Sequence, residues 1–152
     1  MKVGFVNPAK VLENAPQAKE AREQLEQEFA PRERKLSTAE TTLREMEERL
    51  KRDGAVMKES ERRELEREIL AERRELKRDQ QAFKEDLNIR RNEETRKLQR
   101  QLYQTIVSMA EREGYDLIVT DGVVFASERV DITDKVLERL KERHRAGSAG
   151  GQ

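Results

Sequence analysis

The sequence predicts an α+β protein that is predominantly helical, with a long antiparallel coiled-coil hairpin projecting from a small β-rich body. Three observations lead to this prediction. Residues 17–100 combine a dense mixture of both charge signs with almost no strand-like sequence. The strand-like sequence gathers instead in two flanks, near the start and near the end of the chain. Within the charged middle, apolar residues recur at coiled-coil spacings, which is typical of long paired helices.

Composition narrows the class of protein further. Of the 152 residues, 42% are charged and 34% are hydrophobic, which is lean for a single globule. The 32 basic residues balance the 32 acidic ones, so net charge gives no case for nucleic acid or an anionic membrane as partner. The chain has no cysteine and no apolar run long enough to span a bilayer. No signal peptide is visible, so we expect either a cytoplasmic protein or the mature form of an exported one.

The first expected element is a short strand over residues 2–6. Asn7 can then cap the free amides of a first helical turn, and Pro8 suits the first position of that helix. We expect Pro16 to restart the helix. Pro31 lies inside a strong repeat, so it should kink the helix without ending it.

The first helical arm, roughly residues 8–52, follows a heptad repeat. Its two seams are Phe29, Leu36, Leu43, Leu50 and Met57, and then Leu25, Arg32, Ala39, Met46 and Asp53. One complete seam and one imperfect seam predict a helix that is buried against a single slender partner. Asp53 and Gly54 indicate a break, and Ser60 with Glu61 offers the next helix start.

The returning arm, roughly residues 60–112, changes its period to eleven. The stripe consists of Leu65, Leu76, Leu87, Leu98 and Met109, accompanied by Ile69, Phe83 and Leu102. A period of eleven keeps a stripe nearly straight or slightly right-handed, whereas heptads wind left-handed. Two arms of similar length with a short connection predict an antiparallel hairpin, each arm spanning roughly 60–75 Å.

The sequence after Gly114 predicts a small strand-rich segment. Residues 117–119 read as a buried strand, and Asp121-Gly122 as the tight turn of a β-hairpin whose second strand is 123–126. A further short strand is expected at 130–132. Thr133 can then cap a last amphipathic helix that carries Val136, Leu137 and Leu140.

These elements predict three regions along the chain. Residues 1–22 and 103–144 would form the β-rich body, residues 23–102 the hairpin arm with its tip near 53–59, and residues 145–152 a flexible tail. A body of this size is marginal alone and leaves strand edges exposed, so we expect an oligomer. The residues expected in the oligomeric body are Phe5, Leu117, Val119, Val124 and Phe125.

The sequence offers little catalytic chemistry, and we expect no enzyme activity, no cofactor and no metal. His144 lies close to the end of the chain, where a solvated surface position is the expectation. Glu47 and Glu48 are neighbours on a helix, so their side chains diverge and imply no pocket. The glycines are isolated and form no phosphate loop. The arginine pairs alternate with glutamates at helical ion-pair spacings, which favours a solvated face over a nucleic-acid groove.

The expected tip of the hairpin is unusually apolar. Ala55, Val56 and Met57 lie in or beside the turn, where loops are normally polar. Met46 and Leu50 lie one to two turns below them. These side chains either close the top of the coiled coil or contact a partner, and the sequence leaves both interpretations open.

Three stretches of the sequence resemble a known family. They are KVGFVNPAKVLENAP at 2–16, QAFKEDLNIRRNEETRKLQRQL at 81–102 and YDLIVTDGVVFASERVDITDKVLERL at 115–140. Together with the order of elements, they make the chain similar to the Skp/OmpH family of periplasmic chaperones for outer-membrane proteins. The resemblance covers essentially residues 2–141. The net-neutral charge departs from the strongly basic character common in that family.

The resemblance implies a periplasmic homotrimer that holds unfolded outer-membrane proteins between its helical arms without ATP and aids their delivery to the outer membrane. On this interpretation the client-contact residues are Met46, Leu50, Val56 and Met57. It also implies a candidate contact of Arg90 and Arg91 with lipopolysaccharide or an anionic membrane surface, without spanning the membrane. Two alternatives are a structural coiled-coil scaffold and a prefoldin-like chaperone, although prefoldins place their strands between the helices.

Overall fold

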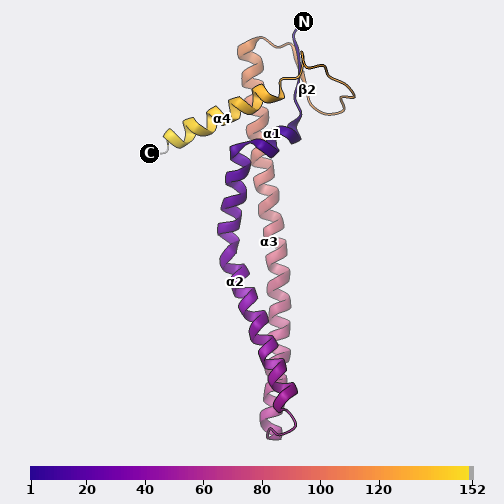
Figure 1. Cartoon of the computed structure of the whole chain (residues 1–152), viewed down its shortest axis with the longest axis vertical. Helices are drawn as coiled ribbons and strands as arrows, with labels where there is room; N and C mark the ends of the chain where they lie inside the picture. Colours follow the sequence, from indigo (N-terminus) through magenta and orange to yellow (C-terminus); the bar gives the residue numbers. More distant parts are fainter. Residues whose placement is uncertain (151–152) are drawn as a thin grey trace. The chain divides into compact units, whose positions relative to one another are not determined.

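The computed structural model describes residues 1–150, with side chains described through Ser148. The elements in chain order are β1 (Val3–Phe5), α1 (Pro8–Asn14), α2 (Pro16–Asp53), α3 (Glu59–Glu113), β2 (Leu117–Val119) and α4 (Thr133–Gly150) (Figure 1). The chain divides into two compact units. One consists of Met1–Gln24 with the chain from Asn92 onward, and we call it the terminal unit. The other, Leu25–Arg91, is the hairpin unit. The predicted class, a predominantly helical α+β chain with a long helix pair, is confirmed.

The sheet of the terminal unit joins the two ends of the sequence. Strands β1 and β2 pair in parallel, with Val3 opposite Leu117, Gly4 opposite Ile118 and Phe5 opposite Val119. On its other side β1 meets the segment before α4, because Phe5 N donates to Val130 O at 2.7 Å and Ile132 N donates to Phe5 O at 2.8 Å. The strand predicted at 130–132 is therefore reduced to a single bridge between Phe5 and Asp131.

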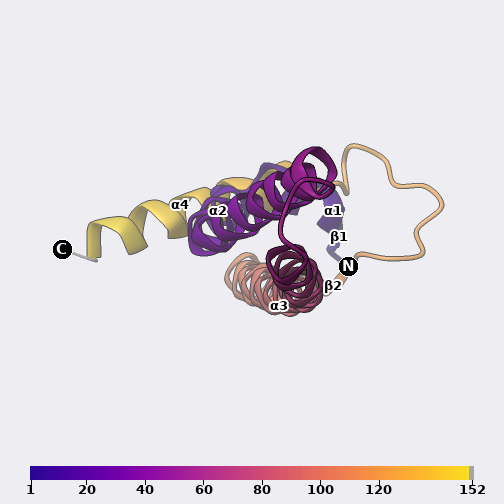
Figure 2. The ribbon, with the colours of Figure 1, turned by 90° about the horizontal axis from the view of Figure 1, so that it is seen from below.

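The β-hairpin predicted at 117–126 is wrong. No strand forms at 123–126, and β2 has β1 as its partner instead of the sequence that follows it. A two-residue turn of the expected type needs positive φ at both of its central residues. Only Gly122 has one, at 73°, while Asp121 keeps a negative φ. The chain consequently leaves β2 in an extended loop (Figure 2).

The core of the terminal unit lies between β1, α1, α3 and α4. Its buried members are Val6, Val11, Ala15, Leu102, Ile106, Met109, Ile132, Val136 and Leu140. Gly4 allows the sheet to approach this core, since a Cβ atom there would lie 2.8 Å from the Cδ1 atom of Ile132. Because side chains alternate along a strand, the neighbours of Gly4 and Ile118 face away from the core.

The helix ends explain why the elements begin and stop where they do. Asn7 caps α1 as predicted, because its Oδ1 accepts from Lys10 N at 3.3 Å. The expected cap of α4 is corrected: Thr133 is the first helical residue, and Asp131 Oδ1 accepts from Thr133 N at 3.0 Å. Helix α3 ends at Glu113; Gly114 follows with a φ of 73°, and Tyr115 N donates to Ala110 O at 2.9 Å.

In the hairpin unit α2 and α3 run side by side in opposite directions (Figures 1 and 2). Every member of both predicted heptad seams of α2 is buried or partly buried, as are Leu65, Ile69, Leu76, Phe83 and Leu87 on α3. The two periods are therefore confirmed by burial. Pro31 lies inside the continuous α2, as predicted.

Helix α4 continues further than the sequence indicated. Residues 145–152 were expected to form a flexible tail, but the helix runs to Gly150. Residues 151–152 lie outside the described part of the chain.

Candidate functional site

The turn of the hairpin exposes Ala55 and Val56 and leaves Met57 partly buried. Gly54 N donates to Leu50 O at 2.9 Å, and the amides of Val56 and Met57 both donate to Asp53 O at 3.0 Å. These bonds occupy three of the N–H donors of the turn, and Val56 is 86% exposed. Of the four residues expected to contact a client, Met46, Leu50 and Met57 are partly buried in the hairpin, so only Val56 is freely presented.

The interior of the hairpin is polar as well as apolar. The rings of Phe29 and Phe83 meet edge to face at a centroid distance of 5.7 Å. The Arg32 guanidinium lies 5.6 Å from the Phe29 centroid and 5.7 Å from that of Phe83, and it donates to Asp86 Oδ2 at 2.8 Å. The arginine in the imperfect seam is therefore held by two rings and a carboxylate, which compensates for its place among apolar residues.

Arg90 and Arg91, the candidate contacts for lipopolysaccharide, have different surroundings. The Arg90 guanidinium pairs across the hairpin with Glu28, with Nη2 3.1 Å from Oε2. Arg91 is exposed. Another cross-hairpin pair joins Arg73 Nε to Glu47 Oε1 at 3.0 Å. Part of the basic character of this arm is thus neutralised by the opposite helix.

The five residues expected in the oligomeric body lie on one sheet face and in the loop after β2. Phe5 and Val119 are partly buried, and Leu117 is half exposed. Val124 is fully exposed and Phe125 is 83% exposed. Two large apolar side chains in solvent on one short loop form the kind of surface that usually meets another protein.

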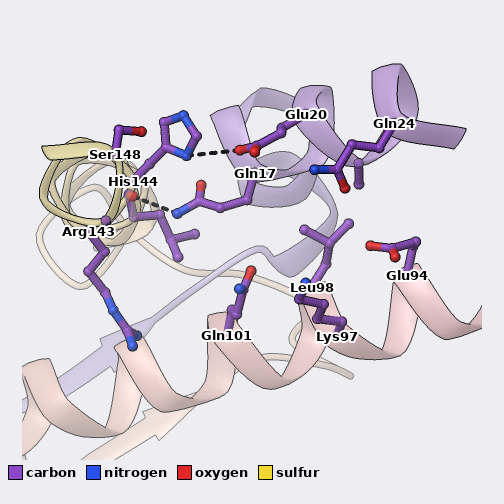
Figure 3. Close-up of a pocket in the computed structure, with 13 residues that line it drawn as sticks. Gln17, Glu20, Gln24, Glu94, Lys97, Leu98, Gln101, Arg143, His144 and Ser148 are labelled. Atoms are coloured by element: carbon purple, nitrogen blue, oxygen red, sulfur yellow. Dashed lines mark hydrogen bonds and ion pairs between the residues drawn. The ribbon is translucent and has the colours of Figure 1, made fainter. Parts of the chain in front are cut away.

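A pocket lies where the start of α2, the C-terminal half of α3 and the end of α4 meet within the terminal unit (Figure 3). Its volume is about 420 Å³. The floor is apolar, formed by Ala21, Leu98 and Leu140, and the rim is polar. The polar lining residues are Gln17, Glu20, Gln24, Glu94, Lys97, Gln101, Arg143, His144 and Ser148.

The only histidine of the chain belongs to this pocket and is not a freely solvated surface residue. His144 Nδ1 lies 3.4 Å from Glu20 Oε2, and its side chain is 30% exposed. Arg143, beside it on α4, donates from Nη1 to Thr105 Oγ1 at 2.6 Å. No local pattern in the sequence predicts this pocket, because its three walls come from segments that are far apart along the chain.

Two carboxyl groups near the sheet have perturbed acidity. The Lys135 ammonium, 2.5 Å from Glu113 Oε1, lowers the pKa of Glu113 below its usual value of 4.5. Hydrogen bonds from the hydroxyl and amide of Thr133 lower the pKa of Asp131 below 3.8. Both groups hold the termini of α3 and α4 in place.

Two other kinds of site are absent from the described residues. No group of three or more His, Asp or Glu side chains there is arranged to hold a metal ion. No helix in residues 1–150 combines the length and apolar character needed to cross a membrane.

The fold and these surfaces define the class: helical-hairpin proteins whose terminal segments share a small α/β unit. Comparison with known proteins identifies the family within that class. The family described as "Outer membrane protein (OmpH-like)" matches residues 2–140. The chain belongs to this family, as the resemblance of its three sequence stretches predicted.

Individual relatives agree with this assignment. The chain is 32% identical to the Chaperone protein Skp of Pectobacterium atrosepticum and 35% identical to that of Photorhabdus luminescens, covering 92% of this chain and 86% of each relative. A crystal structure of an OmpH-like protein from Caulobacter crescentus superposes with a TM-score of 0.82. That match covers 93% of this chain and 85% of the other chain at 15% sequence identity, so it supports the fold alone.

Proposed function

We propose that this protein is an ATP-independent holding chaperone that binds unfolded outer-membrane proteins, prevents their aggregation and aids their delivery to the outer membrane. The observation that carries the proposal is the similarity to relatives named Chaperone protein Skp over 92% of the chain. No catalytic step is needed for such a role. Many weak contacts, each labile, would give avidity while allowing release without nucleotide.

The proposal includes a periplasmic location and a homotrimer. Three copies would join through the sheet face and the loop after β2, and would hold the client between their hairpins. The exposure of Val124 and Phe125 supports this arrangement, because a free chain leaves both side chains in water. The client contacts proposed on the hairpin are Val56 at the turn, with Met46, Leu50 and Met57 becoming available where the two helices part.

The order of elements favours this function over a prefoldin-like one. In this chain β1 precedes the helical hairpin and β2 follows it, whereas prefoldins place their strands between the helices. Contact with lipopolysaccharide remains a subsidiary proposal. It would depend on Arg91, since Arg90 is engaged by Glu28.

An aggregation assay tests the chaperone proposal. Urea-denatured outer-membrane barrel protein is diluted into buffer without nucleotide, with and without a molar excess of this chain, while light scattering is recorded. We expect scattering to be suppressed. A scattering curve unchanged by the chain would refute the proposal. The double variant Val56→Ser/Met57→Ser should suppress less well, whereas a purely structural scaffold would show no dependence on these residues.

A further inference from the structure

We propose that the pocket between α2, α3 and α4 binds the extended main chain of an unfolded client polypeptide. This inference rests on the chaperone function proposed above and adds a second contact region, in the terminal unit, to the one expected on the hairpin. It follows from which polar groups of the pocket are already engaged and which are not.

The charged groups of the pocket already have partners within the described chain, with one exception. Glu20 faces His144 at 3.4 Å, and Arg143 is hydrogen-bonded to Thr105. Glu94 also has a partner. Only Lys97 shows no ion pair or hydrogen bond among the residues that the structure describes. With two carboxylates balancing Lys97 and Arg143, the pocket has little preference for a charged ligand.

Three carboxamides remain as the groups that can recognise a ligand. Figure 3 shows Gln17, Gln24 and Gln101 around the pocket, on α2 and α3. Gln17 Nε2 donates to Leu140 O at 2.7 Å, but Gln17 Oε1 is buried without a donor. Within the described chain, the side-chain amides of Gln24 and Gln101 make no hydrogen bond. A carboxamide offers both a donor and an acceptor, which complements the peptide group of a ligand in either direction.

The buried oxygen of Gln17 favours a ligand that offers a peptide N–H. An unpaired buried acceptor costs about 1–3 kcal/mol, and a donor from a ligand would recover part of that cost. Because this oxygen is buried in the free chain, the ligand reaches it when the Gln17 side-chain amide turns toward the pocket. A phosphate or carboxylate ligand has no N–H to offer and would gain nothing there.

The floor suits the side chains of such a strand. Ala21 and Leu140 are almost fully buried and Leu98 is partly buried, so the floor is apolar but not selective in shape. Successive side chains of an extended strand point to opposite sides, so one could rest on the floor while the next stays in solvent. A volume of about 420 Å³ lies within the usual range of ligand pockets, ~300–1,000 Å³.

Paired substitutions test the role of the free amides. The double variant Gln24→Met/Gln101→Met keeps side-chain length and helix propensity but removes both amides. The control Gln99→Met/Gln104→Met changes two exposed glutamines of α3 that lie outside the pocket. The probe is a fluorescently labelled, urea-denatured outer-membrane barrel protein, diluted without nucleotide. We expect the affinity of the pocket variant to be about five- to tenfold weaker, the loss of one or two hydrogen bonds, and that of the control to be unchanged.

A photo-crosslinking measurement identifies the occupant. A benzophenone amino acid replaces Ser148 at the rim, or Gln99 as control, and the products with the same probe are analysed by mass spectrometry. We expect client adducts from position 148 and none from position 99. Adducts only with a second copy of this chain, or only with its own residues, would overturn the inference.

The two proposals can fail separately. If the unaltered chain does not bind the denatured probe, the chaperone function itself is refuted. If the unaltered chain binds and the pocket variant binds equally well, the function stands and the pocket inference is refuted.

Discussion

At Gly54 the main chain leaves no room for a side chain. A Cβ atom there would lie 2.3 Å from Leu50 O, a backbone atom that cannot move aside cheaply. The same oxygen accepts the hydrogen bond of Gly54 N that closes the turn. The glycine is therefore required by a close approach, and its φ is not positive. The sequence indicated the break at this position without revealing its cause.

We expect Gly54→Ala to destabilise the hairpin by about 2 kcal/mol, because the turn must open to admit the methyl group. Hydrogen exchange of the amides around the turn measures this effect. The matched control is Gly147→Ala, where nothing lies within 4 Å of the added carbon and helix propensity should give a small gain. Equal exchange in the Gly54 variant and the unaltered chain would contradict the geometry of the turn.

The acidity of Glu113 and Asp131 predicts a loss of stability in acid. Both pKa values are lowered in the folded chain, by Lys135 and by Thr133 respectively, so the unfolded chain binds protons more readily. This stabilisation is present above the unfolded pKa values, near 4.5 and 3.8, and is lost as pH falls through the lower folded values.

Urea unfolding between pH 7 and pH 2 measures this linkage. We expect the free energy of unfolding to decline below about pH 4.5, and to decline less steeply in Glu113→Gln. The control Glu111→Gln changes an exposed carboxyl on the same helix and should follow the unaltered chain. Identical slopes in all three proteins would contradict the assigned role of the Glu113–Lys135 pair.

At the scale of elements, Pro31 weakens α2 next to the cluster formed by Phe29, Arg32, Phe83 and Asp86. Its nitrogen carries no hydrogen, so the carbonyl of Gln27 lacks its helical donor. The next residue, Arg32, is held between Phe29 and Phe83 and by Asp86. The side-chain contacts of this cluster thus oppose the local weakness of the main chain.

Pro31→Ala should raise the free energy of unfolding of the hairpin, by up to about 3 kcal/mol, because it restores a main-chain hydrogen bond and helix propensity. Denaturation followed by circular dichroism and slower hydrogen exchange near residue 31 would report the gain. Ala30→Gly serves as the opposite control, since it should lower stability by about 1 kcal/mol. A Pro31→Ala chain with unchanged or lower stability would show that the proline is accommodated without cost.

An element was predictable from the sequence when the element it packs against lies nearby along the chain. The seams containing Phe29 and Leu65 were predictable because the opposite helix follows after a short turn, and heptad and eleven-residue periods mark the face that it covers. The strand at 117–119 was found, but its pairing was not. Its partner is β1, more than one hundred residues away, and no local pattern specifies such a pair.

The candidate site was less predictable than the fold. Val56 was marked as exposed apolar sequence in a turn, and it is exposed. Met46 and Leu50 are partly buried because they are members of the heptad seams. The same heptad pattern was compatible with burial in the coiled coil and with contact to a client. The pocket amides Gln17, Gln24 and Gln101 are ordinary polar residues of charged helices, and only the meeting of three helices gives them a joint role.

At the scale of the whole molecule, the exposed loop after β2 predicts self-association. Val124 and Phe125 have no contact that would bury them within a single chain, and covering both would stabilise an assembly by a few kcal/mol per copy. We expect a trimer in sedimentation equilibrium at micromolar concentration. Val124→Ser/Phe125→Ser should shift the mass toward smaller species.

The control for association is Leu70→Ser, which changes a half-exposed leucine on α3 in the hairpin unit. Its mass should remain that of the unaltered chain. A monomeric unaltered chain would contradict the proposed trimer, and so would a double serine variant that associates as strongly as the original.

The hydrogen bonds between the two ends of the sequence also set an order of events during synthesis. Lys2 N donates to Asp116 Oδ2 across 114 positions, and Asn7 N donates to Thr133 Oγ1 across 126. While the chain is emerging, β1 therefore lacks its strand partner until β2 has been made, and its contacts with the segment before α4 come later still. The hairpin depends on contacts between α2 and α3, which follow one another in the sequence, so it can form earlier. Its formation shortens the effective loop that separates the two ends of the chain. The first strand translated is thus among the last to complete its native contacts, and a chain interrupted before residue 130 would lack the part of the terminal core that Ile132 and α4 supply.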